Sequence, residues 1–203
     1  MEQKYKVFIN TKWIVLTSKI PNTSNAVVLP LESVSFSEVL DFIKEKKAKK
    51  IFLFHHDEAE LLDLFKAKLP VVQAGGGLVT NEKGKTLFIY RKGKWDLPKG
   101  KIDRKESIKK GAKREVKEET GVKKLKITGL AGVTYHIFKR NDIYQLKETF
   151  WYHMTSTYTG ELKPELKEGI TKAKWKGPKK TAKALKNSYE NIRSLMLELS
   201  VTP

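Results

Sequence analysis

A segment between Gly100 and Val122 carries several carboxylates at the spacing of a helix. On a helix, Glu115, Glu118 and Glu119 fall at positions i, i+3 and i+4 and share one face. Carboxylates crowded in this way repel one another, and a bound divalent cation relieves that repulsion. The chain contains no cysteine, so any metal must be held by oxygen or imidazole ligands. Oxygen donors favour a hard ion, Mg²⁺ or Mn²⁺.

Composition offers a plainer interpretation of the same segment. Arg114 stands four residues before Glu118, where a guanidinium can orient that carboxylate on any helix. Lysines are interspersed among the acids, as in an ordinary solvated helix of mixed charge: Lys109, Lys110, Lys113 and Lys117. The residue types alone therefore leave a metal site and a solvated surface helix both open.

The full pattern of the segment carries a stronger signal. The specified positions of the pattern G-x5-E-x7-R-E-U-x-E-E-x-G-U, with U apolar, are filled by Gly100, Glu106, Arg114, Glu115, Val116, Glu118, Glu119, Gly121 and Val122. This pattern is the Nudix box, and the segment resembles it at every specified position. The surroundings are also similar to the Nudix family, with AGG at 74–76, WDLPKG before the box and Trp175 in a late strand. The resemblance covers about residues 71–203.

The resemblance implies both a fold and a metal site. The implied fold class is α/β, an α/β/α sandwich with a mixed sheet in which the box forms a loop, a helix and a second loop. By resemblance, Glu115, Glu118 and Glu119 are the carboxylates of the metal site. The carbonyl of Gly100 is a further expected ligand, and the expected cofactor is Mg²⁺ or Mn²⁺.

The resemblance also implies a reaction, attack of water on phosphorus in a nucleoside diphosphate linked to another group. A later loop often supplies another acid, for which Glu165 and Glu168 are candidates, with Glu168 preferred. The general base is Glu118 or the late-loop glutamate, and the family is not uniform on this point. Arg114 and Glu106 resemble a supporting ion pair. The expected catalytic residues are Glu118, Glu115, Arg114 and Glu168.

Basic residues before the box are candidates for binding phosphate. Lys99, within WDLPKG, is preferred and Arg91 is a second candidate, whereas Lys92 and Lys94 are as well explained as solvated side chains. WDLPKG looks similar to Nudix enzymes acting on dinucleoside polyphosphates, so an anionic nucleotide such as diadenosine tetraphosphate is the expected substrate. Aromatic residues of the later strands are candidates to stack on a base, although about half should point into the core: Tyr135, His136, Phe138, Tyr144 and Trp151.

Rival functions come from other classes. Residues 71–203 carry 30 Lys and Arg against 14 acids, a net charge of +16, whereas residues 1–70 carry +2. That charge suits an RNA-binding protein or an RNA 5′-end pyrophosphohydrolase, but no RNA-binding motif is present and RNA is not favoured as a partner. A Nudix domain that binds a nucleotide without cutting it would not need the complete set of box acids.

Apolar periodicity predicts the elements that position these residues. Residues 1–70 are expected to form a small α/β accessory domain, followed by the Nudix hydrolase domain at 71–203. The accessory domain should contain strands at 5–9, 13–17 and 51–54, a helix from Ser35 or Ser37 through Lys47, and a helix from Asp57. His55 and His56 lie together at a strand end without partners that would make a metal site.

In residues 71–203 the pattern predicts strands at 74–80, 86–91, 124–138, 144–156 and 170–176, a loop at 95–100 and a helix at 107–120. The hairpin turn is expected at 139–142. The chain should end in one amphipathic helix with a single apolar stripe: Leu185, Tyr189, Ile192, Leu195, Met196 and Leu199. No secretory signal is visible and no apolar run approaches the roughly 18 residues that span a bilayer, so a cytoplasmic protein without a membrane partner is expected.

Overall fold

The computed structural model describes residues 5–22, 26–44 and 50–201. The chain divides into two compact units. One contains the chain up to residue 72 together with residues 135–147, and the other contains residues 73–134 and 148 onward. No helix among the described residues is long and apolar enough to cross a membrane.

A sheet forms the centre of the box-bearing unit, with strand order β11-β6-β5-β10-β9. Its strands are β5 (Val71–Asn81), β6 (Thr86–Arg91), β9 (Leu125–Arg140), β10 (Ile143–Ser156) and β11 (Ile170–Lys176). These strands confirm the five predicted in this region. The predicted loop at 95–100 is partly wrong, because it contains two short strands, β7 (Lys94–Asp96) paired with β6 and β8 (Lys99–Lys101) paired with β5.

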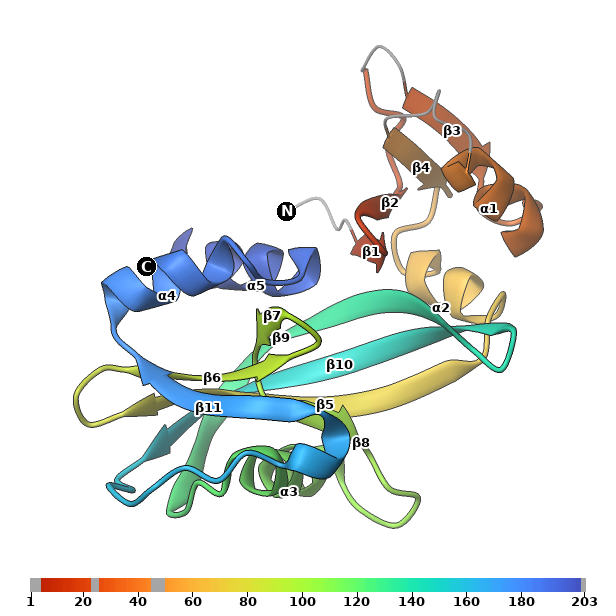
Figure 1. The fold of residues 1–203 in the computed structure, drawn as a ribbon. Coiled ribbons are helices and arrows are strands. Elements are labelled where there is room, and N and C mark those ends of the chain that lie inside the picture. Colours follow the sequence, from red (N-terminus) through yellow and green to blue (C-terminus); the bar gives the residue numbers. More distant parts are fainter. Residues whose placement is uncertain (1–4, 23–25, 45–49, 202–203) are drawn as a thin grey trace. The chain divides into compact units, whose positions relative to one another are not determined.

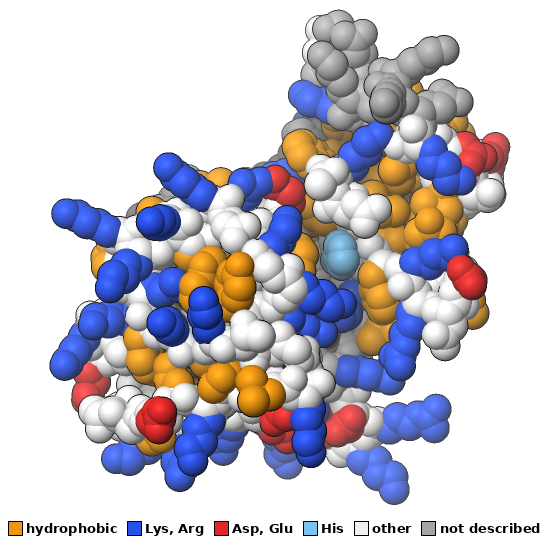
Figure 2. Space-filling view, in the orientation of Figure 1, with side chains coloured by type: hydrophobic (Ala, Val, Ile, Leu, Met, Phe, Trp, Pro, Cys, Tyr) orange, Lys and Arg blue, Asp and Glu red, His pale blue; other side chains and the backbone are white. Residues whose placement is uncertain are grey.

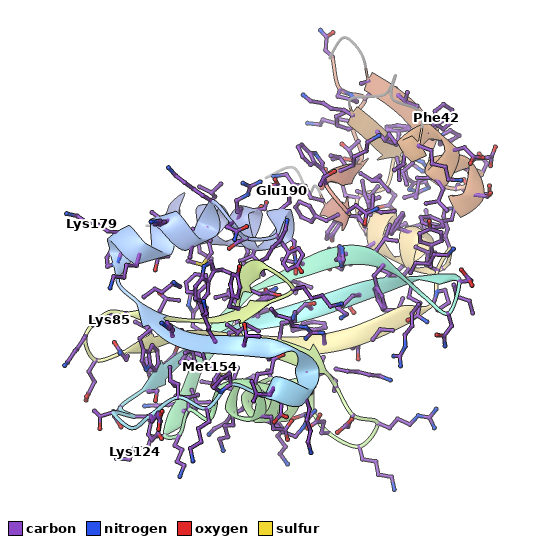
Figure 3. All side chains as sticks on the ribbon, viewed as in Figure 1. Phe42, Lys85, Lys124, Met154, Lys179 and Glu190 are labelled. Atoms are coloured by element: carbon purple, nitrogen blue, oxygen red, sulfur yellow. The ribbon has the colours of Figure 1, made fainter. Side chains whose placement is uncertain are left out.

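Helices cover both faces of this sheet, which confirms the α/β/α sandwich (Figure 1). They are α3 (Ile108–Thr120), α4 (Pro178–Leu185) and α5 (Glu190–Val201). Met154, labelled in Figure 3, belongs to the buried cluster on the face that α3 covers. Leu87 belongs to the same cluster. Phe88 and Trp151 belong to the cluster under α4 and α5. Leu87 and Phe88 are consecutive strand residues, so their side chains point to opposite faces.

The C-terminal segment forms two helices rather than the single helix predicted. Its first helix ends at Leu185, and a turn follows in which Asn187 and Ser188 donate their backbone N–H groups to the carbonyls of Ala184 and Leu185. The apolar stripe survives this break. Ile192 and Leu195 are almost fully buried, and the other predicted members pack around the same cluster.

The other unit is a small α/β structure. Its elements are β1 (Tyr5–Ile9), β2 (Lys12–Thr17), β3 (Ala26–Pro30), β4 (Lys50–Phe54), α1 (Phe36–Lys44) and α2 (Leu61–Lys66). The strand order is β1-β2-β4-β3, and β1 also pairs in parallel with the tip of β9, where Val7 lies opposite Tyr135. The predicted strands at 5–9, 13–17 and 51–54 are confirmed, and β3 was not predicted.

Local details explain the helix boundaries of this unit. The Ser35 hydroxyl accepts the Glu38 N–H at 3.2 Å while the Glu38 carboxylate accepts the Ser35 N–H at 2.8 Å, a capping box that starts α1. Ser35 is therefore the cap, rather than Ser37. The predicted end at Lys47 lies outside the described residues. The second helix starts at Leu61, later than the predicted Asp57, after a turn.

Candidate active site

The helix that carries the box, α3, has a defined cap at each end. Ser107 accepts the backbone N–H of Lys110, and Gly121 closes the helix in the left-handed conformation, with a φ of +69°, while its N–H donates to the carbonyl of Lys117. Glycine suits that position because it has no Cβ to clash there. The predicted helix at 107–120 is confirmed, with Ser107 as its cap.

The box glutamates lie in different environments although they share one helix. Glu115 and Glu119 are buried, with 7% and 1% of their surface exposed, because their side of α3 packs against the sheet. Glu118 lies at the rim, with 53% of its side chain exposed. Burial raises the pKa of the Glu115 carboxyl even though the Arg114 guanidinium beside it acts in the opposite direction.

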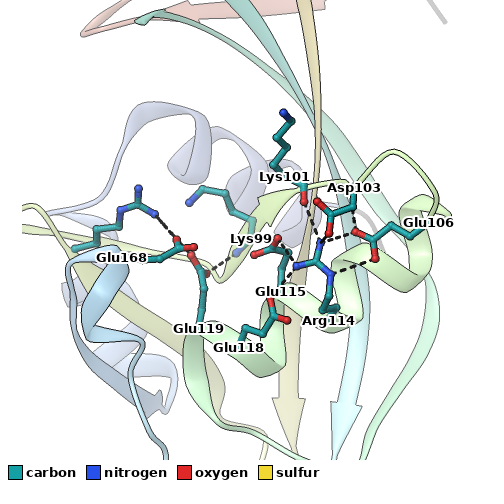
Figure 4. Close-up of polar contacts among 10 residues, drawn as sticks. Lys99, Lys101, Asp103, Glu106, Arg114, Glu115, Glu118, Glu119 and Glu168 are labelled. Atoms are coloured by element: carbon teal, nitrogen blue, oxygen red, sulfur yellow. Dashed lines mark hydrogen bonds and ion pairs between the residues drawn. The ribbon is translucent and has the colours of Figure 1, made fainter.

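Arg114 is the centre of a polar network that joins the box together (Figure 4). Its guanidinium donates to Glu115 Oε1 and to Glu118 Oε2, both at 2.7 Å, and to both carboxylate oxygens of Glu106. It also donates to the carbonyl of Lys101 at 3.1 Å. Hydrogen bonds from Arg114 hold the pKa of Glu106 below its usual range. The expected ion pair between Glu106 and Arg114 is therefore present in the structure.

Glu119 points to a different set of partners. Its Oε2 accepts the backbone N–H of Lys99 at 2.7 Å, whereas its buried Oε1 has no hydrogen-bond partner among the described residues. Arg91 Nη1 lies 3.7 Å from that oxygen, beyond hydrogen-bonding distance. Burial raises the pKa of Glu119 to about 7, although nearby Lys99 favours the charged form.

The two predicted phosphate-binding cations both lie beside this carboxylate. The Lys99 ammonium is 3.2 Å from the carboxylate of Asp96, a buried acid that sequence reasoning did not single out. Burial alone would lower the pKa of Lys99, but Asp96 and Glu119 raise it overall, so the ammonium stays charged. The only sequence signal for Asp96 was an acid three residues before Lys99 in WDLPKG.

The late loop brings Glu168 to the same place. A short 3₁₀ helix, η1 (Leu166–Glu168), precedes β11, and Glu168 Oε2 lies 3.4 Å from Arg91 Nη1. The backbone N–H of Glu165 donates to the carbonyl of Glu119 at 3.2 Å, which ties this loop to the end of α3. The structure therefore places Glu168, the preferred late-loop acid, next to the cation that also faces Glu119.

Other predicted residues lie elsewhere. Trp151 is fully buried and its indole N–H donates to Thr134 Oγ1 at 2.9 Å, so it is one of the candidates that point into the core and it does not stack on a base. The remaining aromatic candidates, Tyr135, His136, Phe138 and Tyr144, belong to the other compact unit. Tyr135 packs there against Tyr5, and Tyr144 against Phe36.

The oxygen donors of this site fit a hard divalent cation, although they do not form a ready-made cage. Among the described residues, no three acidic or histidine side chains converge on one point, because Glu115 and Glu118 bind Arg114 instead. The buried Oε1 of Glu119 has no hydrogen-bond partner among the described residues and faces Arg91 at 3.7 Å, so it is an oxygen that a cation could approach. A Cβ on Gly100 would overlap the Glu115 carboxylate, so the backbone of Gly100 and a candidate ligand are in close contact. A metal ion held by Glu115 and Glu118 would share their oxygens with the Arg114 guanidinium.

Comparisons with known proteins agree with this geometry. A family model described as NUDIX domain matches residues 71–197. The chain is similar to a MutT protein from Methanosarcina mazei Go1, with 24% identity and a TM-score of 0.52, over 66% of this chain and 95% of that one. It is also similar to an Ap4A hydrolase from C. elegans, with 21% identity and a TM-score of 0.51, over 64% of this chain and 95% of that one. At this identity the two structures show the fold.

The family match covers more than half of the chain and contains the complete box, the α3 helix and the Glu168 loop. Nudix hydrolases generally use divalent metals, which agrees with the oxygen donors described above. The chain therefore belongs to the Nudix family, and its enzyme class is that of a pyrophosphohydrolase.

Proposed function

We propose that this protein hydrolyses a diphosphate linkage in an anionic nucleotide with Mg²⁺ or Mn²⁺, and that its substrate is a dinucleoside polyphosphate such as diadenosine tetraphosphate. The observation that carries the proposal is Glu119 of the complete box: its Oε2 accepts the backbone N–H of Lys99, while its buried Oε1 has no hydrogen-bond partner among the described residues and faces Arg91 at 3.7 Å. Such an oxygen is costly to bury without a positive ligand. The metal ligands we propose are Glu115, Glu118 and Glu119, with the carbonyl of Gly100.

The bound metal would lower the pKa of water and neutralise phosphate oxygens. The remaining chemistry falls to the protein. Water adds to phosphorus, the bond from that phosphorus to the bridging oxygen breaks, and the proton of the water passes to a carboxylate. We assign that carboxylate to Glu118, which is exposed at the rim and oriented by Arg114 at 2.7 Å, with Glu168 as the alternative. Glu168 is half exposed and is oriented by Arg91 at 3.4 Å.

Substrate binding would rely on the same cations that neutralise the buried acids. Lys99 and Arg91 lie where a phosphate chain approaching Glu119 would pass, and their charges are partly balanced by Asp96 and Glu168. A polyphosphate chain carries more charge than a sugar nucleotide and gains more attraction from the +16 balance of residues 71–203. The Ap4A hydrolase among the similar structures supports this choice of substrate.

A product-resolved screen tests the proposal. Nucleoside diphosphate derivatives are incubated with the full chain, with Mg²⁺, with Mn²⁺ or with a chelator, and the products are separated by chromatography. We expect turnover only with metal, and the largest kcat/KM for dinucleoside polyphosphates. Tight nucleotide binding without turnover on any compound would instead identify a non-catalytic nucleotide-binding domain.

A further inference from the structure

The edge strand β11 carries a row of lysines that the proposed reaction does not use. Lys172, Lys174 and Lys176 alternate along the strand, so their side chains lie on one face. They lie opposite Tyr90, Phe88 and Thr86 of β6, on the face that α4 and α5 cover. The chain enters β11 through Gly169, directly after Glu168.

Two aromatic rings lie within this row. Tyr90 and Trp95 are half-buried neighbours on β6 and β7, with ring centroids 4.9 Å apart. Lys172 Nζ lies 5.2 Å from the centre of the Tyr90 ring, and Lys176 Nζ lies 3.4 Å from that of Trp95. Such contacts hold an ammonium in place without neutralising its charge. We call this group the lysine track; its members are Lys172, Lys174, Lys176, Tyr90 and Trp95.

The charge of the track is not balanced by nearby acids. From Gly169 to Tyr189 the sequence contains seven lysines and no Asp or Glu. Among the described residues, no ion pair joins Lys172, Lys174 or Lys176 to a carboxylate. The lysines instead repel one another. Burial, together with repulsion from Lys174, Lys180 and Lys172, lowers the pKa of Lys176. Lys and Arg side chains spread over the surface of this unit, including the part formed by α4 and β11 (Figure 2).

The spacing of these charges selects a kind of ligand. Alternate residues of a strand are about 6.6 Å apart, twice the rise of about 3.3 Å per residue. One nucleotide of an extended single strand covers a similar distance, so successive phosphates can meet successive lysines. The two rings hold Lys172 and Lys176 in place along this path, and proteins that bind single strands combine such a basic row with aromatic side chains. The ordinary role of edge lysines, protection against strand pairing, requires neither the rings nor a row without acids.

We propose that the lysine track is a docking site for single-stranded nucleic acid, running along β11 from the loop that carries Glu168 toward α4. Tyr90 and Arg91 are consecutive strand residues and point to opposite faces. The track therefore lies on the face opposite the one where Arg91 meets Glu119. Docking needs no metal and no hydrolysis, and the site goes beyond the proposed function of the carboxylates.

The test is direct binding of a fluorescent oligouridylate of about 12 nucleotides, within the site sizes known for single-strand binders, to the full chain in a metal chelator. The test variant is Lys172→Gln, Lys174→Gln, Lys176→Gln. The matched control removes three exposed lysines just before and at the start of β9, a strand that is not adjacent to β11 or β6: Lys123→Gln, Lys124→Gln, Lys126→Gln. Thermal melts check that each variant is folded.

We expect the track variant to bind on the order of tenfold more weakly, and the slope of log K against log salt to fall by about 2, since each lost phosphate contact removes about 0.7 from that slope. The control should keep the affinity and slope of the parent. Equal losses in both variants would overturn the proposal, because they would show that net charge alone drives binding. Equal affinity for a duplex of the same length, or for polyglutamate, would also overturn it.

A second variant keeps the edge strand charged, in case the glutamine variant aggregates. Lys172→Glu, Lys174→Glu retains a charged side chain at each edge position but reverses the field. If the track binds the oligonucleotide, this variant should lose more affinity than the glutamine variant while staying soluble. Undiminished binding by a folded Lys172→Glu, Lys174→Glu variant would overturn the proposal. Metal-dependent hydrolysis of the nucleotide substrate is measured in parallel with oligonucleotide binding. A loss of binding alone is then distinguished from a loss of hydrolysis.

Discussion

The backbone N–H of Lys99 donates to Glu119 Oε2 at 2.7 Å and thereby ties the short strand β8 to the last turn of α3. The other oxygen of Glu119 stays buried without a hydrogen bond among the described residues, and its nearest cation is Arg91 at 3.7 Å. The contact joins the loop before the box to the helix of the box, two segments on which both metal binding and phosphate binding are proposed to depend.

Substitution of the proposed base should separate chemistry from folding. Glu118→Gln keeps the shape of an exposed side chain, so the melting temperature should hold while metal-dependent kcat falls by at least about 10²-fold. Glu168→Gln is measured beside it, and Glu161→Gln, an exposed acid outside the site, is the matched control. Near-parent turnover of Glu118→Gln together with a large loss for Glu168→Gln would move the base to the late loop.

The contact between Gly100 and Glu115 should not tolerate a methyl group. In Gly100→Ala the new Cβ would overlap the Glu115 carboxylate, so we expect a loss of about 1–3 kcal/mol in the free energy of unfolding, together with weaker metal binding. The matched control is Gly129→Ala on β9, where a Cβ would meet nothing within 4 Å. Denaturant unfolding measures both variants. Equal stability of Gly100→Ala and Gly129→Ala would show that a Cβ at residue 100 fits without a cost in stability.

Removal of the Lys99 ammonium should affect both stability and substrate binding. Lys99→Met leaves Asp96 and Glu119 buried without their shared cation, which should cost on the order of 3 kcal/mol of stability. KM for a polyphosphate substrate should rise as well. Lys101→Met, two residues further along β8 and exposed, is the control. If KM is unchanged in folded Lys99→Met, Lys99 acts on Glu119 and Asp96 alone.

The substrate proposal predicts a preference that depends on salt. kcat/KM for diadenosine tetraphosphate should exceed that for ADP-ribose, because the longer phosphate chain gains more from the positive charge near Arg91 and Lys99. The ratio should shrink as ionic strength rises toward physiological salt, where the Debye length is about 8 Å. A clear preference for ADP-ribose at low salt would contradict the substrate while leaving the hydrolase intact.

The accessory role proposed for residues 1–70 predicts that a chain beginning at Leu69 still hydrolyses substrate. Its stability should fall, because Tyr135 and Ile137 at the tip of β9 lose β1, the strand with which they pair. A companion variant, in which both residues are replaced by threonine in the shortened chain, should recover solubility. Circular dichroism and kcat/KM are measured together. A folded, shortened chain that is inactive on every substrate of the full chain would assign residues 1–70 to the active site.

Local sequence was sufficient to predict an element wherever neighbouring residues determine its type and its ends. The box lies on one helix with a serine cap at Ser107 and a glycine at Gly121, so its element and its ends follow from neighbouring residues. The hairpin turn predicted at 139–142 is found at Asn141 and Asp142, because β9 continues to Arg140, and these two residues adopt the positive φ that their types tolerate.

Elements that depend on distant partners were not predictable in the same way. The strands β7 and β8 have three residues each, too few for periodicity, and exist because they pair with β6 and β5. The apolar stripe of the C-terminal segment stays in one cluster although the helix is broken between α4 and α5. Packing on the sheet, rather than continuity of the helix, decides which of its residues are buried. Trp151 belongs to a strand whose alternation predicts two faces, and the packing of α4 and α5 decided which face is core.

The sequence by itself determined the Nudix family, the helix of the box and the acids that it carries, because the box is a short contiguous pattern on a single element. Only the tertiary structure decided that Glu115 and Glu119 are buried while Glu118 is exposed, that Asp96 joins Lys99, and that Lys172 meets Tyr90. The reason is physical: the burial of a side chain and the register of two strands depend on residues far apart in the chain, and these become neighbours only when the whole sheet has formed.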